Sequence, residues 1–224
     1  MFDRIAGLHD RMNTVMTAGL HHQWRRRAVD LADPPVGGRV LDVATGTGDL
    51  ALALAARVGP EGEVVATDFS ERMLALARAK AAGSGFGAAV RFEPANALSL
   101  PFAEREFDAA TVGFGARNFS DLNRGLAELA RVVRPGGRVV VLEITTPRRP
   151  PLSSFFELWF DRVVPVLGRV ADAQAYSYLP RSVRRFPDPV ELAAMMWRCG
   201  LREIRWIVTA GGIIALHVGE VPGG

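Results

Sequence analysis

Apolar and polar residues alternate with two different periods between residues 39 and 144. Short β-branched runs predict strands, and longer segments with apolar positions three and four residues apart predict helices. In chain order, the expected elements are 39–44 (strand), 49–58 (helix), 63–67 (strand), 70–82 (helix), 90–93 (strand), 107–113 (strand), 121–133 (helix) and 138–144 (strand). Strands that alternate with helices indicate an α/β fold with a mostly parallel sheet.

The two ends of the chain and one internal segment depart from this alternation. A helix over 189–199 precedes two expected strands, 202–208 and 213–218, whose short connection predicts an antiparallel hairpin. Residues 1–30 predict helices. Residues 152–167 carry one broad apolar stripe at helical spacing, which fits either packing on the core or a lid over an apolar pocket.

Composition narrows the class of protein. The 224 residues suit a single domain, and Cys199 is the only cysteine, so an internal disulfide is excluded. Neither a signal peptide nor an apolar run of about 18 residues is present, so we expect a cytoplasmic protein. The net charge of +3 is too balanced to indicate nucleic acid. Arginines at 25–27, 148–149 and 184–185 fit solvated helix faces or contact with anionic lipids.

The most informative segment runs from Val40 to Ala51, where an apolar strand leads into a glycine loop and a helix. Gly46 and Gly48 allow backbone N–H groups to approach a ligand closely. Asp68 follows 20 residues after Gly48, where a carboxylate can accept both hydroxyls of a ribose. The Gly-x-Gly-x-x-Ala pattern alone also fits a nicotinamide dinucleotide or a plain tight turn.

Acidic residues favour one of these ligands. Asp42 and Asp49 flank the loop, and the loop contains no lysine or arginine. Two carboxylates would repel a pyrophosphate by about 1 kcal/mol or more per close pair. S-adenosylmethionine carries an ammonium and a sulfonium instead, so the sequence predicts that cofactor.

Other residues at the ends of the expected strands complete the predicted cofactor site. Asn96 and the backbone of Ala97 follow the third strand and are placed to read an adenine edge, with Met73 packing on its face. Gly113 ends the fourth strand, near the place where a methyl group would face its acceptor. The full set of predicted cofactor contacts is Asp42, Thr45, Gly46, Thr47, Gly48, Asp68, Met73, Asn96, Ala97 and Gly113.

Several stretches together resemble the ubiquinone/menaquinone-biosynthesis C-methyltransferase family. The stretches are residues 2–6 with Asp10 and Asn13, 41–49, 113–118, 176–179 with Ser182 and 186–187, and 209–217. The resemblance covers residues 1 to about 219, and residues 113–118 and 176–179 are its most specific parts. It implies the class I S-adenosylmethionine-dependent methyltransferase (Rossmann-like) fold, with seven strands and a C-terminal antiparallel hairpin. The chain departs from the family at His9-Asp10, where Tyr-Asp is usual.

The resemblance implies methylation of a ring carbon of a prenylated quinol. Demethylmenaquinol is the usual acceptor, and a methoxy-benzoquinol of ubiquinone synthesis is the related alternative. Another methyltransferase acting on a small polar acceptor or on RNA, a nicotinamide-dependent oxidoreductase and a non-catalytic cofactor-binding protein are the other candidates.

Catalysis at a ring carbon requires a neighbouring phenolate and removal of a proton. Arg117 is our candidate to hold the phenolate, with Asn118 orienting it, although Arg117 also fits a loop salt bridge. The candidates for the base or for further contacts are His9, Asp10, Tyr176 and Tyr178. His21, His22 and His217 do not have the spacing of a metal site, so no metal is expected.

A lipophilic quinol as substrate predicts peripheral contact with the inner face of a membrane, through residues 152–167 and the arginines at 25–27. No nucleic-acid partner is expected, and a homodimer is compatible with the sequence. Within one domain, we expect an N-terminal helical substrate or lid segment (1–30), a cofactor-binding core (39–144), a lid or acceptor insertion (150–187) and a C-terminal helix and hairpin (188–219).

Overall fold

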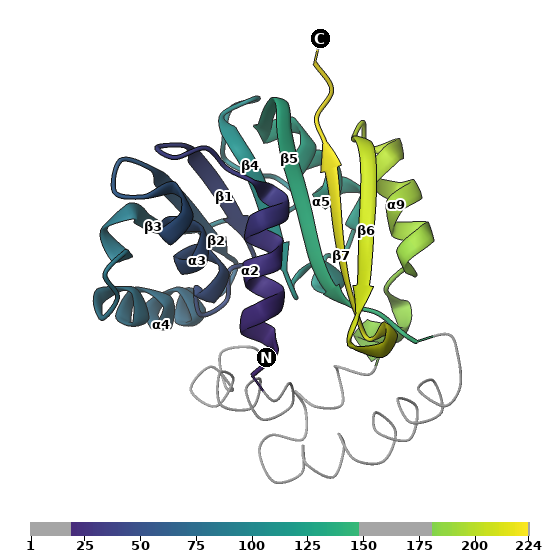
Figure 1. Cartoon of the computed structure of the whole chain (residues 1–224), viewed down its shortest axis with the longest axis horizontal. Helices are drawn as coiled ribbons and strands as arrows, with labels where there is room; N and C mark the ends of the chain where they lie inside the picture. Colours follow the sequence, from purple (N-terminus) through teal and green to yellow (C-terminus); the bar gives the residue numbers. More distant parts are fainter. Residues whose placement is uncertain (1–18, 148–180, 224) are drawn as a thin grey trace, which may run out of the picture.

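The computed structural model describes residues 19–147 and 181–223, which contain a seven-stranded sheet flanked by helices (Figure 1). The strand order is β3-β2-β1-β4-β5-β7-β6. The strands are β1 (Arg39–Val43), β2 (Glu63–Asp68), β3 (Val90–Pro94), β4 (Phe107–Gly113), β5 (Val133–Ile144), β6 (Arg202–Thr209) and β7 (Ile214–Glu220). Strands β1 to β5 are parallel, and β7 runs antiparallel to both β5 and β6, so the expected sheet and hairpin are confirmed.

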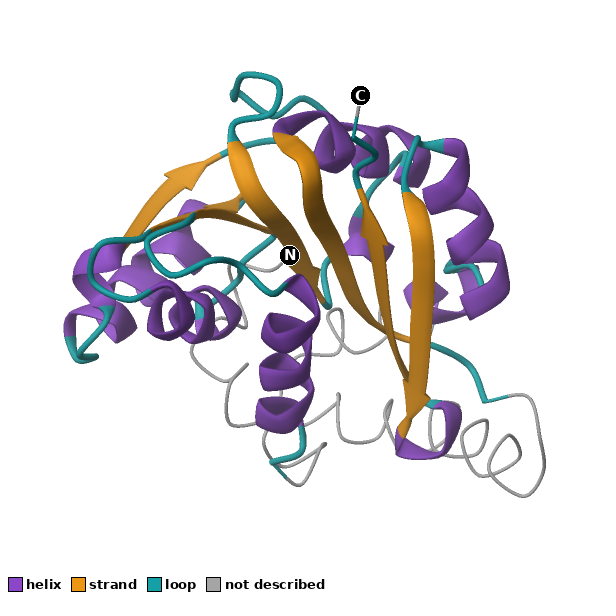
Figure 2. Cartoon of the chain, turned by 45° about the horizontal axis from the view of Figure 1, so that its top comes forward, coloured by secondary structure: helices purple, strands orange, loops and turns teal. Residues whose placement is uncertain are grey.

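Helices cover both faces of the sheet (Figure 2). The helices are α2 (His21–Ala32), α3 (Asp49–Val58), α4 (Glu71–Ala82), α5 (Leu122–Val132) and α9 (Pro189–Arg198), with 3-10 turns η2 (Gly87–Ala89), η3 (Ala116–Asn118) and η5 (Ala210–Gly212). Helices α2 and α3 share one hydrophobic cluster with the sheet, and α5 and α9 share the cluster on the opposite face. Helix α4 packs on β2 and β3 at one end of the sheet.

The central strands are buried on both faces, which explains why they read as continuous apolar runs. On β1, Val40 faces the cluster under α2 and α3, and Leu41 faces the cluster under α5 and α9. The exposed fraction of both side chains is 0%. Burial of a side chain of this size contributes about 1.5–3 kcal/mol, so these positions set the register of the strand.

The start of β5 differs most from the expected element boundaries. β5 begins at Val133 instead of residue 138, because the Pro-Gly-Gly segment is accommodated as an irregularity within the strand. The pairing with β4 shifts there, and Gly136 has a φ of +79°. The helix start at Ser70 is as the sequence predicted, since the Ser70 hydroxyl accepts a hydrogen bond from the Met73 N–H at 3.3 Å.

The carboxyl ends of β1, β2, β3, β4 and β5 meet along one edge of the sheet, the lower edge in Figure 1. Ligands of open α/β sheets bind outside this edge. The N-terminus of α2 lies at the same edge (Figure 1). Every described residue of the predicted cofactor site except Met73 lies on or after the end of a strand at this edge.

Candidate functional site

The glycine loop follows β1 and has an unusual backbone. Ala44, Gly46 and Gly48 have φ values of +54°, +58° and +84°, a conformation that glycine adopts without steric cost. A Cβ at Gly48 would lie 3.1 Å from Cβ of Ala77, so glycine allows α4 to pack closely on the loop. At Gly46, no heavy atom of the described residues other than its two chain neighbours would lie within 4 Å of such a Cβ. The loop therefore has one packed side and one open side.

Asp42 forms the base of the loop and is 1% exposed. Its carboxylate accepts hydrogen bonds from the hydroxyls of Thr45 and Thr111, both at 2.6 Å. Burial raises the pKa of Asp42 to about 6, although the hydroxyls of Thr111 and Thr45 lower it. The charge of Arg25 also lowers the pKa of Asp42, but among the described residues no lysine or arginine forms an ion pair with this carboxylate. No such ion pair therefore competes with a cationic ligand.

Asp68, at the end of β2, ties the loop to α4. One carboxylate oxygen accepts from the N–H of Gly46 at 2.9 Å, and the other accepts from the N–H of Ser70 at 2.9 Å. The two backbone bonds hold the carboxylate beside the loop. This is the position that the sequence predicted for a residue that contacts a ribose.

The surroundings of Asp49 correct the electrostatic picture drawn from the sequence. Nζ of Lys80 lies 2.7 Å from one Asp49 oxygen, and Nη2 of Arg25 lies 3.3 Å from the other. Lys80 also donates to the hydroxyl of Thr47 at 3.0 Å. Two cations from α4 and α2 thus compensate Asp49, although the loop itself contains neither lysine nor arginine. A preference for a cationic ligand would therefore depend on Asp42 and not on Asp49.

Arg25 does not belong to an exposed lipid-binding patch, as one interpretation of the sequence had it. Its side chain is 12% exposed, contacts His21 and lies over the ring of Phe114, with Cζ 5.9 Å from the ring centroid. Arg26 and Arg27 are exposed on the outer side of α2. The three arginines at 25–27 therefore do not form one surface patch, because neighbouring residues of a helix point in different directions.

A tight turn after β4 brings the predicted acceptor residues against the cofactor loop. Phe114 has a φ of +60°, and a Cβ at Gly115 would lie 2.5 Å from Cβ of Ala44. Real Cβ atoms do not approach this closely, so glycine is required for the contact. The turn leads directly into η3, which carries Arg117 and Asn118.

Arg117 forms a buried ion pair with Glu143, a residue that sequence reasoning missed. Nη1 of Arg117 donates to Glu143 at 2.6 Å and to the carbonyl of Phe114 at 2.6 Å. The side chain of Glu143 is 1% exposed. The only sequence signal for Glu143 is a single acid near the end of an apolar strand. Nε of Arg117 and Oδ1 of Asn118 are buried without a hydrogen-bond partner among the described residues.

The remaining predicted cofactor contacts are located as follows. Met73 is buried on α4, and Gly113 lies at the end of β4, where a Cβ would be 3.0 Å from Leu50. The side chain of Asn96 accepts from the N–H of Leu98 at 3.0 Å and so closes its own turn after β3, with Ala97 inside that turn. Their contacts with adenine stay predictions.

Four of the predicted catalytic residues and the aromatic stripe lie outside the described residues. They are His9, Asp10, Tyr176, Tyr178 and residues 152–167.

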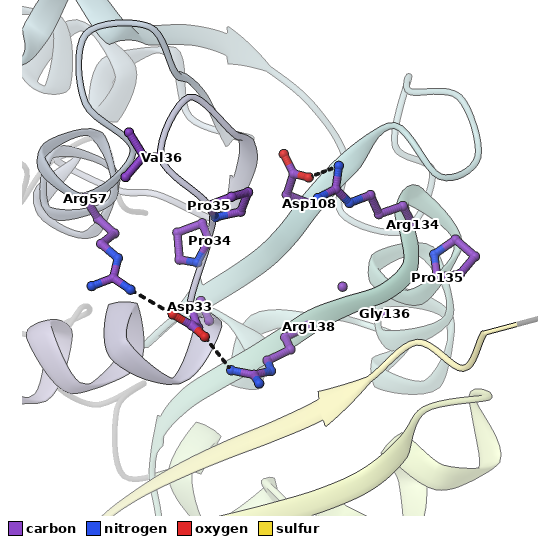
Figure 3. Close-up of a pocket in the computed structure, with 12 residues that line it drawn as sticks. Asp33, Pro34, Pro35, Val36, Arg57, Asp108, Arg134, Pro135, Gly136 and Arg138 are labelled. Carbon is purple, nitrogen blue, oxygen red and sulfur yellow. Dashed lines mark hydrogen bonds and ion pairs between the residues drawn. The ribbon is translucent and has the colours of Figure 1, made fainter.

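A cavity of about 720 Å³ lies at the opposite, amino-terminal edge of the sheet (Figure 3). Its charged groups pair with one another: Asp33 contacts Arg57 at 2.7 Å and Arg138 at 3.3 Å, and Asp108 contacts Arg134. The cavity is remote from the glycine loop, and its acids and arginines compensate each other. It therefore has the character of a structural charge network.

Comparison with known sequences agrees with the geometry of the site. A model of the ubiE/COQ5 methyltransferase family matches residues 1–221. A demethylmenaquinone methyltransferase from Thermus thermophilus is 47% identical, over 99% of this chain and 100% of the relative. A ubiquinone/menaquinone biosynthesis C-methyltransferase from Geobacter sulfurreducens is 42% identical, over 98% of this chain and 86% of the relative.

Solved structures with lower sequence identity share the fold. The YcgJ protein from Bacillus subtilis has a TM-score of 0.67 at 22% identity, covering 91% of this chain and 100% of that chain. A SAM-dependent methyltransferase from Thermotoga maritima has a TM-score of 0.69 at 19% identity, covering 98% of this chain and 97% of that chain. The expected fold class is confirmed.

Proposed function

Given that the chain belongs to the ubiE/COQ5 methyltransferase family, we propose that it methylates a ring carbon of demethylmenaquinol with S-adenosylmethionine as the methyl donor. One observation carries the proposal: the turn that bears Arg117 packs against the cofactor loop through Gly115 and Ala44. Groups suited to a cationic donor and to a phenolic acceptor therefore lie side by side at the carboxyl edge of the sheet.

The residues present fit S-adenosylmethionine. Asp42 offers a buried negative charge with no ion-pair partner among the described residues, which suits a cation and disfavours a diphosphate. Gly46 leaves the ligand side of the loop open, and Asp68 is held in place for a ribose. When bound, the cofactor supplies an electrophilic methyl group on its sulfonium sulfur. A nicotinamide-dependent oxidoreductase is disfavoured on the same grounds.

Residues of the chain would prepare the acceptor. A ring carbon becomes nucleophilic when the neighbouring hydroxyl is deprotonated, and the guanidinium of Arg117 would stabilise the resulting phenolate. Asn118 would orient the ring oxygen. Arginine is almost never deprotonated, so the base is another residue, for which His9, Asp10, Tyr176 and Tyr178 are the candidates. Holding the reactants in line contributes about 7–11 kcal/mol in favourable cases.

Relatives support menaquinone over ubiquinone chemistry. The proteins from Thermus thermophilus and from Desulfitobacterium hafniense, at 47% and 41% identity, are both demethylmenaquinone methyltransferases. A direct test incubates the purified protein with S-adenosylmethionine and either demethylmenaquinol or a methoxy-benzoquinol in detergent micelles. We expect mass spectrometry to detect a methyl group on the first acceptor. Absence of product, or binding of NADH in place of S-adenosylhomocysteine, would refute the proposal.

The apolar tail of such a quinol also requires contact with a membrane surface. No helix of the described residues is long and apolar enough to cross a bilayer. We propose peripheral docking through the aromatic residues of 152–167, assisted by the exposed Arg26 and Arg27. Co-sedimentation with anionic liposomes should fall when Trp159 and Phe160 are both changed to serine, and unchanged binding would exclude these residues.

A further inference from the structure

Glu143 is an acid at the end of β5 that has no role in the cofactor site or in the acceptor site described above. It is 1% exposed, and the alternation of β5 puts it on the same face as Val139 and Val141, which belong to the hydrophobic cluster beneath α5 and α9. Its oxygens accept three hydrogen bonds: from Nη1 of Arg117 at 2.6 Å, from the N–H of Arg117 at 3.2 Å and from the N–H of Ile144 at 2.8 Å. Side chain and backbone of Arg117 are thus held by one carboxylate.

A buried ion pair by itself contributes little to the stability of the folded protein. The desolvation of two charges often exceeds their attraction, and apolar residues of similar size are frequently as stable. The pair between Arg117 and Glu143 lies at the edge of the sheet where ligands bind. Its position there is better explained by the need to hold a guanidinium in one orientation.

The orientation leaves a specific pair of groups available. Nη1 of Arg117 is occupied by Glu143 and by the carbonyl of Phe114, whereas Nε is buried without a partner in the described part of the chain. Oδ1 of Asn118 is likewise buried and unpartnered there. A buried donor or acceptor without a partner is costly, and a bound hydroxyl group would supply the missing hydrogen bonds.

We propose that Glu143 is a positioning residue for methyl transfer, which fixes Arg117 so that its Nε–H donates to the ring hydroxyl of the acceptor and the side-chain carbonyl of Asn118 accepts from that hydroxyl before it is deprotonated. The inference rests on the proposed function and deepens it. Glu143 does not contact the acceptor; it holds the guanidinium in place and compensates its charge when the acceptor site is empty.

The first test is kinetic and uses two matched variants. Glu143→Gln keeps the shape of the side chain but removes its charge. We expect kcat with demethylmenaquinol to fall about 10- to 100-fold, while the Kd of S-adenosylhomocysteine stays within about twofold. Glu106→Gln is the control, because Glu106 also accepts from an arginine and from a backbone N–H, at 2.7 Å each, but at the amino end of β4. Its kcat should match the wild type. Equal kcat in the wild type and Glu143→Gln would overturn the inference.

The second test is independent of turnover, and its wild-type measurement does not depend on the folding of a variant. The 15N–1H signal of Nε in Arg117, assigned with Arg117→Lys, is followed while 1,4-dihydroxynaphthalene is added to the wild-type protein saturated with S-adenosylhomocysteine. We expect the signal to shift in the wild type and in Glu106→Gln, and to stay unshifted in Glu143→Gln. A wild-type signal that does not shift when the diol is added would contradict the inference. If the signal responds but demethylmenaquinol is not methylated, the proposed function fails and the role of Glu143 stands for another hydroxylated ring.

Discussion

Thr111 on β4 donates a hydrogen bond of 2.6 Å to Asp42 on β1, across the pair of strands at the centre of the sheet. The bond holds a buried carboxylate beneath the cofactor loop. Burial nevertheless raises the pKa of Asp42 to about 6 from an ordinary value of 3.8. The ionised form therefore costs more free energy in the folded protein than in the unfolded chain, and a bound cation would offset that cost.

We expect Asp42→Asn to make the ligand-free protein more stable and to weaken its binding of S-adenosylmethionine. At pH 7.5 the wild type buries a charge that the unfolded chain would expose, at a cost of about 1–3 kcal/mol. Asparagine removes that cost, so the midpoint of thermal unfolding should rise by roughly 2–4 °C per kcal/mol. Differential scanning calorimetry and titration calorimetry measure the two effects. A variant that is less stable and binds the cofactor normally would show that Asp42 has a purely structural role.

Binding of S-adenosylmethionine should weaken in acid. The cationic ligand prefers the ionised carboxylate of Asp42, and below about pH 6 the free protein holds this group protonated. The Kd should therefore rise by up to about tenfold per pH unit below pH 6, and binding should take place with release of a proton. Calorimetry between pH 5 and 8, in buffers of different ionisation enthalpy, measures both. In Asp42→Asn the dependence should be absent; a steep dependence in this variant would place the titrating group elsewhere.

Gly115→Ala should separate the acceptor turn from the cofactor loop. The added Cβ would lie 2.5 Å from Cβ of Ala44, so the backbone must move. We expect a loss of about 1–3 kcal/mol in the free energy of unfolding, together with a lower kcat. Gly85→Ala is the matched control, because a Cβ there meets no described atom within 4 Å and the φ of Gly85 is not positive. Equal urea midpoints for the two variants would contradict the close approach.

His217 should make the protein less stable in acid. Burial lowers the pKa of His217 to about 4, although the hydrogen bond to the carbonyl of Pro189 raises it. The unfolded histidine, with a pKa of 6.5, binds a proton first as the pH falls. The contribution of neutral, buried His217 to the free energy of unfolding is therefore complete above pH 6.5. It decreases by about 1–3 kcal/mol as the pH falls from 6.5 to 4.

Asp42 changes the stability with pH in the opposite direction, because its pKa is higher in the folded protein than in the unfolded chain. Its unfavourable contribution to the free energy of unfolding therefore disappears as the pH falls through 6. Urea unfolding at pH 7.5 and 5 distinguishes the two residues. The loss in acid should be smaller in His217→Gln and larger in Asp42→Asn than in the wild type. A loss equal to that of the wild type in both variants would contradict these assignments.

Local patterns along the chain were sufficient to predict the fold and the position of the glycine loop. The alternation of apolar runs predicted the sheet and its terminal hairpin, because strand and helix periods depend on residues close together in sequence. Gly46 and Gly48 marked the loop for the same reason: the left-handed backbone they adopt is a property of single residues.

Only the tertiary structure decided which charges meet. Lys80 compensates Asp49 from 31 residues away, and Arg117 pairs with Glu143 across 26 residues. Nothing in the neighbouring sequence marks these partners, because a charge interacts with whatever the fold places within a few ångströms. Burial decides the pKa of Asp42 in the same way, since a strand's pattern shows which face is apolar but not how completely other layers exclude water from its end.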